Sequence, residues 1–143
     1  MAAYCTLDDL VKLLPEDILV QLTDDDNLGV IDTGRIGEAI ATAGAEIDGW
    51  CAPRYVVPFT EPVPALIKKC AIDVAIYNLY SRRVETIPET RATRYKEAMR
   101  LLKDIATGNV ALGTAEIPAA RTEGVLTVVA PDRLFPHDLL DRM

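Results

Sequence analysis

The chain has 143 residues, of which 50% are hydrophobic and 26% charged, a composition that suits one globular domain and excludes an intrinsically disordered chain. Its longest uncharged run, residues 105–115, has 11 residues, which is too few to span a bilayer, and we expect no signal peptide at its start. The formal charge of −7 is concentrated in residues 1–34, which hold eight acidic residues and one basic residue.

The N-terminal third of the chain predicts three helices. Thr6 and Asp9 are placed as a capping box, which opens a first helix over residues 6–14, and Pro15 ends this helix and opens a second short one. After a loop rich in Asp, Asn and Gly, apolar residues recur every three or four positions from Ile36 onwards. This spacing predicts a long helix over about residues 33–52, with Trp50 at the end of its apolar face.

Prolines divide the middle of the chain. Residues 53–64 contain four prolines and predict an extended linker, and a long helix over about residues 64–83 follows. Apolar residues lie on more than one face of this helix, so we expect it to be the most buried. Pro88 opens a last helix that Gly108 ends. The predicted fold class is therefore all-α: a small bundle of about four main helices with a Pro-rich linker and an extended C-terminal arm.

The periodic pattern stops before the end of the chain. Residues 1–113 form the predicted helical domain, and residues 114–143 form the predicted arm. The arm keeps apolar residues, and such segments often become ordered on a partner. We expect it to dock on neighbouring chains, with folding back on its own domain as the alternative. The predicted partner-contact residues are Leu134, Phe135, Leu139 and Leu140.

The chain offers few residues for catalysis or for cofactor binding. It has one histidine, His137, one serine, Ser81, and three cysteines with no CxxC pair. A histidine-rich zinc site cannot be built from one histidine, and a Ser-His-Asp triad would need this single pair to meet. We therefore expect no enzymatic activity and no cofactor. The three cysteines are expected to be reduced and packed in the core.

The acidic loop resembles half of a calcium-binding loop. Asp24, Asp26 and Asp32 fall at ligand positions, and Gly29 falls at the position of the turn. Arg35, however, stands where such a loop needs a bidentate glutamate. The favoured interpretation is an acidic turn that caps the next helix, and a calcium site is the alternative.

The helix after Pro88 has a basic outer face. Seven basic residues lie between positions 82 and 103, and they can neutralise phosphates, so a DNA-binding or packaging accessory protein that uses this helix is the alternative function. Because the chain is acidic overall, a solvated or subunit-contacting face is favoured. The predicted subunit contacts are basic residues of this helix and acidic residues of the loop: Arg91, Arg94, Arg100, Asp24, Asp25 and Asp26.

Short motifs in a fixed order resemble a known phage family. They are YCTLDDL at residues 4–10, QLTDDD at 21–26, AEIDG at 45–49, RYVVP at 54–58, LYSRR at 79–83 and RYKEA at 94–98. Over about residues 4–113, the chain is similar to a small structural protein of Mu-like phages and prophages. The helical layout of this family resembles that of the head–tail connectors, or adaptors, of long-tailed phages.

The resemblance implies a structural role in the virion. Connectors form a ring, typically of twelve subunits, below the portal, where they conduct DNA and join the capsid to the tail. The implied partners are other copies of the chain, the portal protein, a tail-side neck or tail-terminator protein, and DNA passing through without sequence-specific binding, with no membrane. The implied location is the virion neck, after assembly in the host cytoplasm. Two uses of the charge split stay open: pairing between neighbouring subunits, or a negative lining for the DNA channel.

Overall fold

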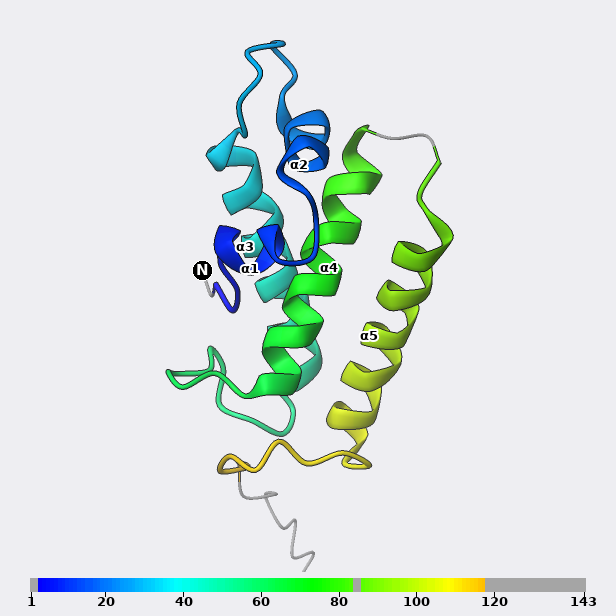
Figure 1. The fold of residues 1–143 in the computed structure, drawn as a ribbon. Helices are drawn as coiled ribbons and strands as arrows, with labels where there is room; N and C mark the ends of the chain where they lie inside the picture. Colours follow the sequence, from blue (N-terminus) through cyan, green and yellow to red (C-terminus); the bar gives the residue numbers. More distant parts are fainter. Residues whose placement is uncertain (1–2, 84–85, 118–143) are drawn as a thin grey trace, which may run out of the picture.

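The computed structural model describes residues 3–83 and 86–117, and this part of the chain is helical (Figure 1). Two short helices precede three long helices of 19 residues each: α1 (Leu7–Val11), α2 (Glu16–Thr23), α3 (Thr33–Cys51), α4 (Ala65–Arg83) and α5 (Glu89–Thr107). The predicted all-α class is confirmed. The part of the arm that carries Leu134, Phe135, Leu139 and Leu140 lies outside the described residues.

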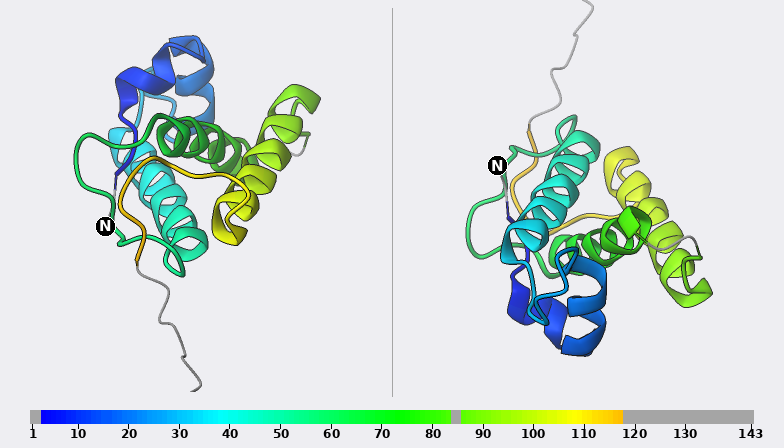
Figure 2. Two further views of the ribbon diagram at one scale, coloured as in Figure 1. Left: turned by 90° about the horizontal axis from the view of Figure 1, so that it is seen from below. Right: turned by 90° about the horizontal axis from the view of Figure 1, so that it is seen from above.

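Helix α4 lies at the centre of the bundle. It packs against each of the other four helices, and the views along the long axis show it between α3 and α5, with α1 and α2 on a further side (Figure 2). Apolar residues of α4 are buried on more than one side of the helix, among them Ile67, Val74, Ala75, Ile76 and Leu79. The apolar residues on more than one face of this helix therefore reflect its contacts on several sides.

Successive long helices run antiparallel, α3 against α4 and α4 against α5, and they place two connecting segments at opposite ends of the molecule (Figure 1). The loop of residues 24–32 lies at one end, near the C-terminus of α4, and we call this the loop end. The linker of residues 53–64 lies at the other end, together with residues 109–117, and we call this the linker end. None of the described helices is long and apolar enough to cross a membrane.

The helix ends follow local sequence signals. The Thr6 backbone N–H donates to the Asp9 carboxylate at 3.0 Å and the Asp9 N–H donates to the Thr6 hydroxyl at 3.4 Å, which confirms the capping box. Gly108 ends α5 with a φ of 90°, a left-handed conformation that favours glycine. The first helix is shorter than predicted, since α1 ends at Val11, four residues before Pro15.

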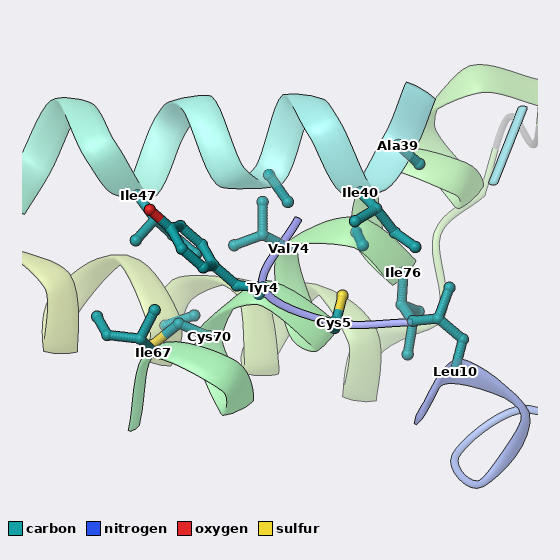
Figure 3. Packing of buried hydrophobic residues seen from close by; sticks show 14 of the residues in the cluster. Tyr4, Cys5, Leu10, Ala39, Ile40, Ile47, Ile67, Cys70, Val74 and Ile76 are labelled. Carbon is teal, nitrogen blue, oxygen red and sulfur yellow. The ribbon is translucent and has the colours of Figure 1, made fainter. Parts of the chain in front are cut away.

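The core joins the N-terminal segment to α3 and α4. Figure 3 shows Tyr4 and Cys5 packed among side chains of these helices. The three cysteines, Cys5, Cys51 and Cys70, are free and buried, and burial raises the pKa of each thiol to about 11. The prediction that they are packed in the core is confirmed.

The last turn of α3 differs from the sequence prediction. Trp50 is 37% exposed, whereas Cys51 is fully buried. Both positions are compatible with the spacing of the apolar face, because residues three and four positions after Ile47 lie on neighbouring parts of a helix surface. Helix α4 approaches on the side of Cys51, so it buries this residue and leaves Trp50 exposed.

Candidate assembly surfaces

Three arginines converge on Asp25 at the loop end. Arg82 donates to its carboxylate through both terminal nitrogens, at 2.7 and 3.0 Å, and Arg83 donates at 3.0 Å. Arg35, from the first turn of α3, forms an ion pair with the same carboxylate at 2.8 Å. The acidic loop is thereby tied to the start of α3 and to the end of α4.

The carboxylates of the neighbouring Asp24 and Asp32 accept hydrogen bonds from backbone N–H groups. The Asp24 carboxylate accepts hydrogen bonds from the N–H groups of Leu28, at 2.9 Å, and Gly29, at 2.7 Å, and these bonds lower the pKa of its carboxyl. The Asp32 carboxylate accepts the N–H groups of Gly34, at 3.0 Å, and Arg35, at 3.2 Å, and so caps α3.

This arrangement is the acidic turn with a helix cap that the sequence favoured. Within residues 3–83 and 86–117, no group of three or more His, Cys, Asp or Glu side chains could hold a metal ion.

The structure divides the predicted subunit-contact residues into two groups. Asp25 is occupied by arginines of its own chain, Arg91 donates to the Leu13 carbonyl at 3.1 Å, and Arg94 lies 4.0 Å from the buried Asp73 carboxylate. Arg100 and Asp26 are exposed and make no ion pair with any described residue. Sequence spacing cannot separate these groups, because Arg82 and Asp25 are 57 residues apart.

The linker end is organised around Tyr55, which is 1% exposed. Its hydroxyl accepts the Leu112 N–H at 3.2 Å and bonds to the Glu116 carboxylate at 3.3 Å. An isolated antiparallel bridge joins Tyr55 to Glu116, and the Ile117 N–H donates to the Arg54 carbonyl at 2.8 Å. The last described residues of the chain are thus held against the linker.

The N-terminal segment also contacts the linker end. The Tyr4 hydroxyl bonds to Asp48 and accepts the Phe59 N–H, the latter at 3.0 Å. The Tyr4 and Phe59 rings meet edge to face with their centroids 5.7 Å apart. Sequence reasoning placed no interaction here, because the three residues are far apart in the chain and follow no common period.

The most exposed large apolar side chains of the described residues lie at the two ends. Leu28 and Val30 are 72% and 59% exposed in the loop of residues 24–32, and Val56 is 70% exposed at the linker end. The other exposed ones are Ile117 at 42%, Val11 and Leu13 at 41%, and Trp50 at 37%. Exposed apolar residues that lie close together are typical of surfaces that meet another protein.

Comparisons with known proteins agree with the motifs of the sequence. The chain matches the family model described as Bacteriophage Mu, Gp36 over residues 4–130. It is 33% identical over 125 residues to "Gene product J" of Escherichia phage Mu, a match that covers 85% of this chain and 84% of that protein. It is also 26% identical over 116 residues to "Mu-like prophage FluMu protein gp36" of Haemophilus influenzae, covering 81% and 79%.

Proposed function

Because the chain belongs to the Gp36 family of bacteriophage Mu, we propose that it is a structural head–tail connector, or adaptor, of a tailed-phage neck. In this role it forms a ring below the portal, conducts DNA and joins the capsid to the tail. Its partners are further copies of itself, the portal protein and a tail-side neck or tail-terminator protein. DNA passes through the ring without sequence-specific binding.

The observation that carries this proposal is the pair of apolar ends. A connector meets proteins on its head side and on its tail side, and exposed apolar side chains at both ends of a small helical domain suit that position. The loop that carries Leu28 and Val30 lies at one end, and the segments that carry Val56 and Ile117 lie at the other (Figure 1). A ring also requires two different contact surfaces on each subunit.

The protein acts by binding, without a catalytic step. Residues 1–113 form the connector domain, and residues 114–143 form an arm whose first residues are held against the linker of their own chain and whose remainder docks on neighbouring chains. The charged groups of the loop end support a structural role, since the ion pairs of Asp25 with its arginines fix the loop.

Removal of the gene from a phage or prophage that carries it tests the proposal. We expect DNA-filled heads and separate tails by electron microscopy, and complementation with the full chain should restore tailed particles. An antibody to the chain should label the neck of complete virions. Normally tailed particles without the protein would contradict the connector role.

A DNA-binding or packaging accessory protein is the second candidate. It is favoured by Lys96, Arg100 and Lys103, which are exposed on α5 and form no ion pair with any other described residue. Arg82 and Arg83, in contrast, are already bonded to Asp25. A gel shift with duplex DNA tests it, because several phosphate contacts would give binding that falls steeply with salt concentration. Absence of a shift at low salt would discard this candidate.

A further inference from the structure

A hollow of about 220 Å³ opens at the linker end. Its lining is mostly apolar and comes from two segments, the linker and the last described residues. Val56, on its rim, is 70% exposed. The lining residues that carry the argument are Tyr55, Val56, Pro58, Phe59, Pro64 and Ala115.

The two walls of this hollow are fixed to each other by Arg54. Its guanidinium donates to the Glu116 carboxylate at 2.6 Å and to the Ile105 carbonyl at 3.4 Å. Gly108 permits this position, because a Cβ atom there would lie 2.3 Å from Nη1 of Arg54. With the backbone bond from Ile117 to Arg54, the segment that carries Ala115 is held in place as a wall.

The size and chemistry of the hollow indicate what it accepts. Small-molecule pockets usually enclose roughly 300–1,000 Å³, so a space of about 220 Å³ suits one or two side chains. The aromatic and proline lining favours apolar side chains over charged ones. A short apolar segment of a protein chain is therefore a better match than a cofactor.

We propose that the hollow receives Leu134 and Phe135 from the arm of a second copy of this chain. This inference rests on the proposed connector function, since it joins neighbouring subunits of the ring. The occupant is apolar, and it belongs to the segment that continues from the last described residue, Ile117, which lies beside the hollow.

The length of the arm suits a second copy. Sixteen residues separate Ile117 from Leu134, and at about 3.3 Å per residue they can span roughly 50 Å. A domain of this size has a radius of gyration of about 13 Å and is roughly 35 Å across, so the arm can reach the equivalent hollow of a neighbour. If the arm folded back into the hollow of its own chain, only a few linking residues would be needed, because Ala115 already forms part of the wall. Sixteen residues are more than that contact requires.

Photo-crosslinking in assembled particles tests this docking. Two full-length versions are supplied together to a phage that lacks the gene, one with p-benzoylphenylalanine in place of Val56 and one with an N-terminal tag. After irradiation of purified virions, we expect a tagged band with the mass of two chains, whose crosslinked peptides map to residues 131–143. Phe135→Asp in the tagged version should lower the yield of this band about tenfold or more, because it removes the burial of one large apolar side chain.

The control places the same crosslinker at Val30, which is 59% exposed at the opposite end of the molecule. It should give no crosslink to residues 131–143. Crosslinks from position 56 to the arm of the same chain, to another protein only, or to no part of the arm would overturn the docking proposal. If the protein is present in the neck in these cases, the connector role stands. If virions lack the protein, both proposals fail.

Discussion

The two ends of the molecule are held together by different interactions. At the loop end, Arg35, Arg82 and Arg83 meet the carboxylate of Asp25, whose side chain is 31% exposed. At the linker end, Tyr55 is 1% exposed and its ring lies 6.0 Å from that of Phe59. One end is closed by a cluster of partly exposed ion pairs, and the other is closed by aromatic burial together with the single ion pair of Arg54 and Glu116.

This difference indicates how stability is distributed. Partly exposed ion pairs contribute little to the free energy of unfolding and are screened by salt, whereas a large buried ring contributes several kcal/mol. The linker end should therefore hold the domain together, and the loop end should tolerate change. Substitution of the exposed Leu28 and Val30 should then cost the fold little.

The largest effect should come from Tyr55. We expect Tyr55→Ala to lower the free energy of unfolding by about 3–5 kcal/mol, because it empties a buried aromatic position. Tyr55→Phe, which removes only the bonds of the hydroxyl to Leu112 and Glu116, should cost about 1 kcal/mol. Urea unfolding followed by circular dichroism measures both. Equal losses in the two variants would show that burial does not close the linker end.

An intermediate effect is expected at Gly108. Gly108→Ala should lower stability by about 1–3 kcal/mol, because φ is 90° and the new Cβ atom would displace Nη1 of Arg54, 2.3 Å away. Gly37→Ala is the matched control, since a Cβ atom there meets nothing within 4 Å and the position is helical. It should raise stability by about 0.5–1 kcal/mol. Thermal unfolding of the two variants should therefore shift in opposite directions, and shifts in the same direction would argue against the role of Arg54.

The smallest effect should come from Asp25. Asp25→Asn removes the charge that three arginines share, and we expect a loss of about 1 kcal/mol or less. The difference from the unmodified chain should shrink in about 1 M salt, because the Debye length is then only about 3 Å. Asp26→Asn is the control, since Asp26 forms no ion pair with any described residue. A loss of several kcal/mol for Asp25→Asn in urea unfolding would remove the contrast between the two ends.

Local patterns in the sequence were enough to predict the helices. The capping box of Thr6 and Asp9, the Asp32 cap, the Pro-rich linker and the final Gly108 each act within a few residues, and each appears in the structure. Part of the candidate site followed from the same patterns, namely the acidic loop as a turn and cap. The motifs at residues 4–10 and 54–58 also indicated the family to which the chain belongs.

The sequence by itself therefore determined the all-α class and the order of the helices, because these depend on interactions between near neighbours in the chain, and its motifs indicated the family. Only the tertiary structure decided which charges pair and which apolar residues stay exposed. Arg82 meets Asp25 across 57 residues, and Arg54 meets Glu116 across 62. Such pairs depend on the angles at which helices pack, and no local spacing encodes them. The same packing buried Cys51 in place of Trp50 and formed the hollow beside Val56.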